Sequence, residues 1–133
     1  MTGDDFIILA GKLATSADEA SLRSAVSRAY YGAFHLALQF LDDIERPVPQ
    51  NANAHVYAAR QLQRSGQSDA YRAGSLLGDL HTERIKADYR LNNPRIGTTA
   101  FARLCVERAS EIQASLAKCR AEPARSEIQA RTI

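Results

Sequence analysis

Apolar residues recur along most of the chain at the three- and four-residue spacing of amphipathic helices. The breaks between these segments carry the residues that interrupt helices: Pro47, Pro49, Gly66 and Asn92-Asn93-Pro94. The pattern predicts helices over residues 4–13, 17–42, 54–64, 69–91 and 99–120. Pro123 is expected to end regular structure. Residues 1–121 are therefore expected to form a single helical domain, and residues 122–133 a flexible tail.

The start of the second segment carries a local signal of its own. Ser16-Ala17-Asp18-Glu19 is typical of a capping box, so the helix is expected to begin just after Ser16. Three of the five segments exceed 20 residues, and the connections between them are short. Long helices with short connections pack as antiparallel neighbours. We therefore expect an all-α fold, an up-and-down bundle of four long helices plus a short one.

The composition supports helices over strands. The chain has 133 residues, of which 23 are Ala, while Val, Ile and Thr together number 18. Ala loses no side-chain entropy in a helix, whereas β-branched residues lose rotamer freedom there. An all-β sandwich is close to excluded.

Charge and targeting signals narrow the function classes only a little. The net charge of +2 is too small to identify a nucleic-acid-binding protein. Arg outnumbers Lys by 14 to 3, which suits phosphate binding but also follows from genome base composition. The apolar run Phe6–Ala10 is too short for a membrane span or a signal peptide, so a cytoplasmic protein without membrane contact is expected. The three His and two Cys are scattered, and no metal or cofactor is expected.

The segment 17–42 has two distinct faces on a helical wheel. A broad apolar arc is expected to face the core, and it comprises Leu22, Val26, Ala29, Tyr30, Ala33, Phe34, Ala37, Phe40 and Leu41. Roughly opposite lies a second stripe, which comprises Ser24, Arg28, Tyr31, His35 and Asp42. Arg28 and His35 are seven residues apart and fall within about 20° of each other. Tyr31 lies between them at contact spacing.

Two interpretations of this stripe stay open. It is a solvated face, or it is a small anion site in which Arg28 binds a phosphate and His35 moves a proton. A single helix face makes only a shallow site. A second copy packed across the stripe would deepen it, so we expect Ser24, Arg28, Tyr31 and His35 to lie at a two-fold interface of a homodimer.

Residues 27–37, SRAYYGAFHLA, resemble the signature helix of the HEPN superfamily, in particular its small free-standing prokaryotic members. Two later features are similar to that group: His55, after the second-helix break, and residues 84–89, RIKADY. The resemblance covers roughly residues 17–118. It implies a helical bundle that often dimerises through the signature helices.

The resemblance also implies an activity. Many members are metal-independent endoribonucleases with an R-x(4–6)-H motif, and six residues separate Arg28 from His35. In such enzymes the RNA 2′-OH attacks the adjacent phosphate and leaves a 2′,3′-cyclic phosphate. By position, His35 would be the general acid and base, and Arg28 would stabilise the developing charge. Ser24 and Tyr31 would contact RNA or phosphate.

The other motif residues have structural interpretations. Asp88 is expected to pair with an Arg such as Arg84, and Tyr89 to be a buried Tyr with a locally satisfied hydroxyl. His55 is expected to be a loop or cap residue near the start of its helix. His81 is expected to be an isolated polar position.

Two functions therefore remain. The first is a ribonuclease of toxin or defence type. The second is a non-catalytic binding module that pairs with a separate nucleotidyltransferase-type antitoxin or binds a nucleotide. Ala29 favours the second, because the residue after the motif Arg is usually polar in the nucleases. A purely structural dimer is a third interpretation, in which Arg28 and His35 serve only the interface.

Overall fold

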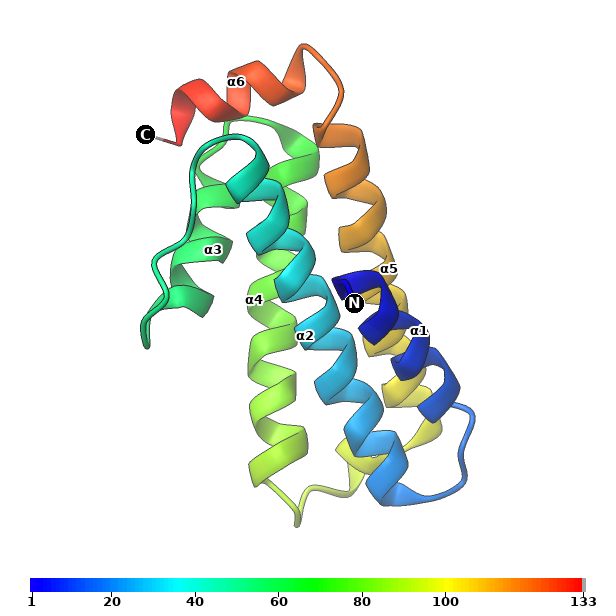
Figure 1. The fold of residues 1–133 in the computed structure, drawn as a ribbon. Helices are drawn as coiled ribbons and strands as arrows, with labels where there is room; N and C mark the ends of the chain where they lie inside the picture. Colours follow the sequence, from blue (N-terminus) through cyan, green and yellow to red (C-terminus); the bar gives the residue numbers. More distant parts are fainter. Residues whose placement is uncertain (133) are drawn as a thin grey trace.

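The computed structural model describes residues 1–132, and over these residues it contains helices and no strand. Figure 1 shows their order. The elements are α1 (Gly3–Leu13), α2 (Glu19–Asp43), α3 (Ala54–Gln63), α4 (Ser68–Tyr89), the 3-10 helix η1 (Pro94–Gly97), α5 (Thr99–Cys119) and α6 (Ala124–Arg131). The prediction of an all-α fold is confirmed.

The long helices number three in this part of the chain, not the four that the sequence analysis expects. Helices α2, α4 and α5 have 25, 22 and 21 residues, and they run side by side (Figure 1). Helix α1 has 11 residues and α3 has 10. Helix α1 ends at Leu13, and a turn follows at Ala14 and Thr15. No helix of residues 1–132 is long and apolar enough to cross a membrane.

Side-chain caps fix where two of the long helices begin. Helix α2 begins two residues later than the expected capping box, because Asp18 is its N-cap and accepts a hydrogen bond from the backbone N–H of Ser21 (3.1 Å). Ser16 instead accepts from the backbone N–H of Asp18 (3.0 Å). Thr98 caps α5 through the backbone N–H of Phe101 (3.2 Å). Each cap satisfies one of the N–H groups that a helix start leaves without an intrahelical partner.

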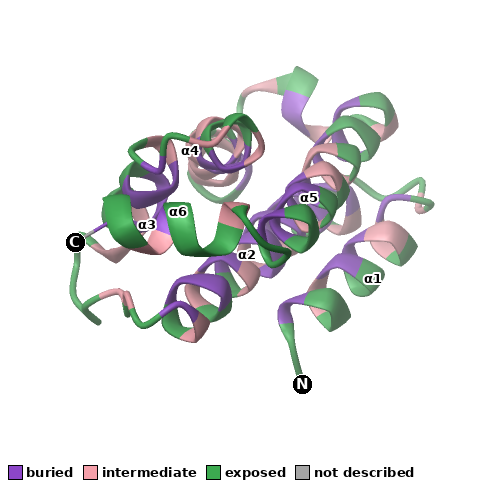
Figure 2. Cartoon of the chain, turned by 90° about the horizontal axis from the view of Figure 1, so that it is seen from above, coloured by how far each residue is buried: buried purple, intermediate pink, exposed green. Residues whose placement is uncertain are grey.

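Helix α2 supplies the centre of the core. All nine residues of its predicted apolar arc are buried, so the prediction of its core face is confirmed. Seen from above, the buried positions of α2 and α5 turn toward the middle of the molecule, and exposed positions form the outside (Figure 2).

A second side of α2 is covered by α1, which the sequence analysis does not predict. The two backbones approach closely where Gly32 faces α1. A Cβ atom on Gly32 would lie 2.8 Å from the carbonyl oxygen of Gly3 and 2.7 Å from Cγ1 of Ile7. Glycine therefore permits this contact, which brings Phe6 of α1 onto the polar stripe of α2.

Residues 124–131 form α6 instead of continuing the expected flexible tail. This helix lies across one end of the bundle (Figure 1). It is held there because the side chain of Ile128 is fully buried. Two hydrogen bonds also join α6 to the segment that follows α2. Gln129 Nε2 donates to the carbonyl of Ile44 (2.9 Å), and Arg46 Nε donates to the carbonyl of Gln129 (3.1 Å). Residue 133 lies outside the described residues.

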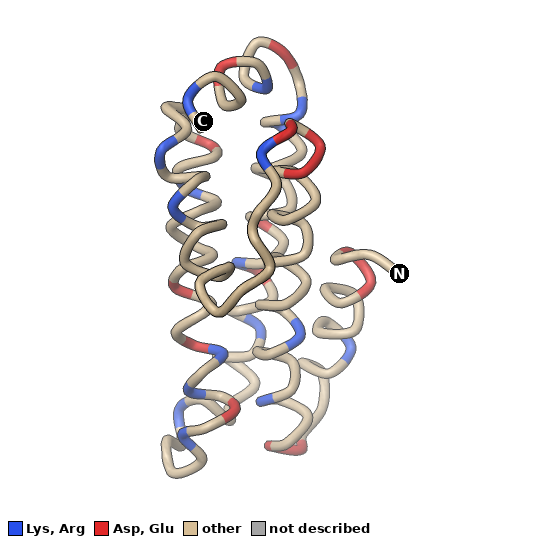
Figure 3. Tube along the Cα trace, turned by 60° about the vertical axis from the view of Figure 1, so that its left-hand side comes forward, with Lys and Arg blue, Asp and Glu red and all other residues tan. Residues whose placement is uncertain are grey.

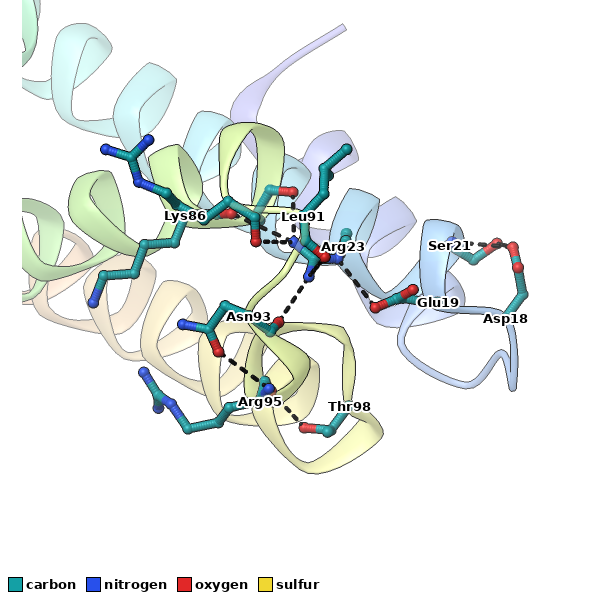
Figure 4. Close-up of polar contacts among 11 residues, drawn as sticks. Asp18, Glu19, Ser21, Arg23, Lys86, Leu91, Asn93, Arg95 and Thr98 are labelled. Carbon is teal, nitrogen blue, oxygen red and sulfur yellow. Dashed lines mark hydrogen bonds and ion pairs between the residues drawn. The ribbon is translucent and has the colours of Figure 1, made fainter.

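A buried arginine ties α2 to the end of α4. Arg23 is 7% exposed. Its Nη1 donates to the carbonyls of Ala87 (3.1 Å) and Arg90 (3.2 Å), and its Nη2 to that of Asn93 (2.8 Å) (Figure 4). The last carbonyls of a helix have no intrahelical partner and carry the negative end of the helix dipole. Arg23 donates hydrogen bonds to carbonyls at this helix end and places a positive charge beside the negative end of the dipole.

Replacing Arg23 by Met, which is similar in length, is expected to lower the free energy of unfolding by roughly 3 kcal/mol, because buried carbonyls lose their donors. Urea denaturation followed by circular dichroism measures this loss. The matched control is Arg72→Met, in which the lost cation pairs with Glu111 on the surface; the control should remain close to wild type. An Arg23→Met protein within about 1 kcal/mol of wild type would contradict this role.

Candidate functional site

The residues of the predicted stripe lie on one face of α2, and α1 covers part of that face. Ser24 and His35 are exposed, and Arg28 and Tyr31 are half-buried. Cζ of Arg28 lies 5.3 Å from the ring centroid of Phe6. The ring of His35 stacks on Phe6 with centroids 5.6 Å apart and planes at 14°. Arg28 and His35 therefore both contact Phe6, so α1 covers part of this face.

A second guanidinium, from α4, joins Arg28. The Cζ atoms of Arg28 and Arg84 lie 5.3 Å and 5.4 Å from the ring centroid of Tyr31. Both distances suit a cation–π contact. Two cations from two helices thus meet around one ring. The sequence alone predicts a pairing of Arg84 with Asp88 but no contact with Tyr31.

The carboxylate of Asp88 lies beside this pair of cations. Its Oδ2 accepts from Nη1 of Arg84 (3.4 Å) and from the hydroxyl of Ser27 (3.4 Å). Arg28 Nη2 in turn donates to that hydroxyl (3.4 Å). The expected pairing of Asp88 with Arg84 is confirmed. All three contacts are long, so they hold the groups weakly.

The cations outnumber the anion in this cluster. Arg28 and Arg84 carry two positive charges against the single negative charge of Asp88. The side chain of Arg84 is 13% exposed, and its Nε is buried without a hydrogen-bond acceptor. Guanidinium groups bind phosphate through paired N–H donors. The arrangement is therefore suited to an added anion.

Tyr89 does not belong to this cluster. It is 68% exposed, which corrects the expectation of a buried Tyr. The reason is its position in α4: Ala87 faces the core, and a residue two positions later points about 200° around the helix.

The structure brings His55 and His81 together, although the sequence analysis treats them separately. Their rings stack with centroids 4.8 Å apart and planes at 7°. Phe34 stacks on His55 at 4.4 Å, and the hydroxyl of Tyr30 is hydrogen-bonded to Nδ1 of His55. The expectation that His81 is isolated is therefore wrong, because α4 places it against the first turn of α3. His55 is half-buried and packs inward instead of serving as a cap.

Burial sets the protonation of this pair. Desolvation lowers the pKa of His55, with a further contribution from Arg84. Desolvation also lowers the pKa of His81, followed by the charges of His55 and Arg84. Burial raises the pKa of Tyr30 above its ordinary value of 10.0. The rings consequently stack as neutral groups at neutral pH.

A broad cleft of about 1150 Å³ brings His35 of the predicted stripe together with His55. His35, His55, Phe6 and Phe34 line it together with the loop that carries Pro47 and Pro49. Arg28 does not line the cleft, but it contacts Phe6, which does. Ser24 lies exposed, one turn before Arg28, and takes part in none of these contacts.

No protein-family model, curated protein or solved structure matches the chain. Within residues 1–132, no three His, Cys, Asp or Glu side chains form a group able to hold a metal ion. The HEPN resemblance of residues 27–37 stays a prediction. The function is therefore argued from the chemistry of the cluster itself.

The stacked histidines predict how stability depends on pH. Their pKa values lie below the ordinary 6.5 in the folded protein. The unfolded chain therefore binds protons first as the pH falls, and stability that is complete above pH 6.5 is lost below it. The double variant His55→Gln/His81→Gln should lose less stability between about pH 7.5 and pH 5.5 than wild type.

Denaturation midpoints measured across this range test the assignment. The control is His35→Gln, which removes an exposed histidine and leaves the stacked pair intact; its midpoint should fall with pH as in wild type. A double variant with the wild-type slope would show that the pair does not govern the pH dependence.

Proposed function

We propose that the protein is an endoribonuclease of toxin or defence type, which cleaves RNA through Arg28 and His35. The observation that carries the proposal is the convergence of Arg28 and Arg84 on Tyr31. It provides excess positive charge on the helix face that also carries His35, an exposed histidine that lines a cleft. The R-x(6)-H spacing of the signature segment supports the same assignment.

In this proposal the guanidinium groups of Arg28 and Arg84 bind the phosphate. The contacts that Arg28 and Arg84 make to Ser27 and Asp88 are 3.4 Å long, so a phosphate oxygen would replace them at little cost. Charge accumulates on the phosphate oxygens as the transition state forms. Two preorganised cations stabilise that charge more strongly than they stabilise the ground state.

In this proposal His35 transfers the proton. In the proposed reaction its imidazole accepts the proton of a ribose 2′-OH, and the 2′ oxygen forms a bond to phosphorus. The bond between phosphorus and the 5′ oxygen breaks, and the imidazolium returns the proton to that leaving oxygen. The products are a 2′,3′-cyclic phosphate and a 5′-hydroxyl end, so no atom is gained or lost.

Within one copy of α2, Arg28 and His35 are too far apart to contact the same phosphate. Arg28 and His35 are seven positions apart, which is about 10 Å along the helix axis. Tyr31 lies near the midpoint. A two-fold axis passing near Tyr31 would place Arg28 of one copy opposite His35 of the other. We therefore propose that the catalytic unit is a homodimer paired through α2.

The second candidate function is a binding module. Phe6 contacts both Arg28 and His35, and Ala29 is fully buried, so no polar group follows Arg28 into the site. Both features favour a protein that uses its Arg pair to bind a nucleotide, or to dock a separate nucleotidyltransferase-type antitoxin, without cutting RNA.

Purified protein incubated with total RNA in the absence of added metal tests the ribonuclease proposal. Wild type should produce 2′,3′-cyclic phosphate ends. His35→Ala should abolish cleavage, and Arg28→Lys should restore little of what Arg28→Ala loses, because an ammonium lacks the planar donor fork. Arg103→Ala, which removes an exposed arginine on α5, is the matched control and should cut normally.

Two results would defeat the ribonuclease proposal: no cleavage of varied RNAs by wild type, or full cleavage by His35→Ala. Mononucleotide binding then decides the second candidate. A binding module should lose affinity in Arg28→Ala and in Arg84→Ala, and should keep it in His35→Ala. His35 is exposed and Arg28 is half-buried, so variants at these two positions should stay folded, within about 1 kcal/mol of wild type. The side chain of Arg84 is 13% exposed, so circular dichroism checks that Arg84→Ala keeps its fold.

A further inference from the structure

One side of α3 carries a second set of polar residues, separate from the Arg28 cluster. Tyr57, Arg60, Gln61 and Arg64 recur at three- and four-residue spacing, which places them on one side of the helix. With Asn53 and Val56 they line a groove of about 500 Å³. The ring of Tyr57 is 37% exposed. We call these residues the α3 groove.

The charge of this region has a single sign. The sequence contains no acidic residue between Glu45 and Asp69. Arg60 and Arg64 are exposed. Within residues 1–132 neither takes part in an ion pair. Figure 3 turns this side of the molecule forward and shows α3 at the edge of the bundle with basic positions along it.

Gln61 lines the groove and holds a buried acceptor that has no partner. Its side chain is buried, and Nε2 donates to the hydroxyl of Tyr57 (2.7 Å). Its Oε1 is also buried and has no donor. A buried acceptor without a partner is costly, and a ligand that donates an N–H or O–H removes that cost. The groove is therefore lined by an aromatic ring, by two cations without an ion pair and by a residue whose buried acceptor lacks a hydrogen bond.

We propose that the α3 groove binds single-stranded RNA. A base stacks on Tyr57, and binding turns the Gln61 amide so that its buried Oε1 accepts a hydrogen bond from a base edge or a ribose hydroxyl. Arg60 and Arg64, one turn apart at about 6 Å along the axis, pair with phosphates of the same strand. An acidic peptide would satisfy the two cations, but the ring and the acceptor favour a nucleotide.

This site deepens the proposed function, because it rests on RNA as the ligand and adds residues that take no part in cleavage. The first turn of α3 joins the two sites. His55 lines the large cleft together with His35, whereas Val56 and Tyr57 line the α3 groove. A strand held on the groove therefore continues toward the cleft, and the groove would set the affinity for RNA without setting the chemistry.

Binding is measured by fluorescence anisotropy with a labelled single-stranded RNA of roughly 12 nucleotides, using the His35→Ala protein so that the probe stays intact. Adding Arg60→Ala and Arg64→Ala should reduce the slope of log affinity against log salt by about 1.4, or about 0.7 for each lost phosphate contact. The matched control is Arg103→Ala/Lys118→Ala, which removes two exposed cations of α5 and should leave the slope unchanged.

Tyr57 separates base stacking from charge. Tyr57→Ala should weaken binding roughly fivefold to hundredfold, whereas Tyr57→Phe keeps the ring and should bind nearly as wild type does. Equal effects of the α3 and α5 cation pairs would overturn the proposal. So would an unchanged affinity in Tyr57→Ala, or an acidic peptide of equal charge that binds as tightly as the RNA.

The two proposals fail in different ways. Cleavage by wild type combined with unchanged RNA affinity in the α3 variants would remove the α3 groove and leave the ribonuclease. RNA binding that depends on Tyr57, Arg60 and Arg64 in a protein that cuts nothing would do the reverse.

Discussion

The hydrogen bonds from Arg23 to the end of α4 set the relation between the two helices that build the site. Because α2 and α4 are antiparallel neighbours, fixing one pair of positions fixes every later pair. Above Arg23 and Ala87, Ser27 meets Asp88, Tyr31 meets Arg84, and Tyr30 meets His81. A slip by one turn would separate all of these partners. The site chemistry therefore depends on a buried cation outside it.

Short-range signals explain what the sequence predicts well. The apolar arc of α2 and the breaks at Pro47, Gly66 and Pro94 are local patterns, and the helices and core face agree with them. Arg28, Tyr31 and His35 share a face because helical spacing alone places them there. Pairing of Asp88 with Arg84 follows from the same spacing.

Contacts between distant segments explain what the sequence does not reveal. Arg23 is an ordinary polar position of α2 until α4 ends beside it. His55 and His81 lie on different helices, so no local pattern predicts their stacking. Phe6 covers the stripe only because Gly32 lets α1 approach. Ile128 is one apolar residue in a polar segment, and its burial became visible only with the bundle end that receives it.

If the register of α2 and α4 joins Arg28 and Arg84 into one phosphate site, both guanidiniums should respond to the same ligand. Heteronuclear NMR can follow the arginine Nε–H groups during titration with a 3′-mononucleotide. We expect the Arg28 and Arg84 signals to shift together with one dissociation constant, while Arg72, which is paired on the surface, stays unchanged. Signals that do not move, or a shift of Arg28 without Arg84, would contradict this arrangement.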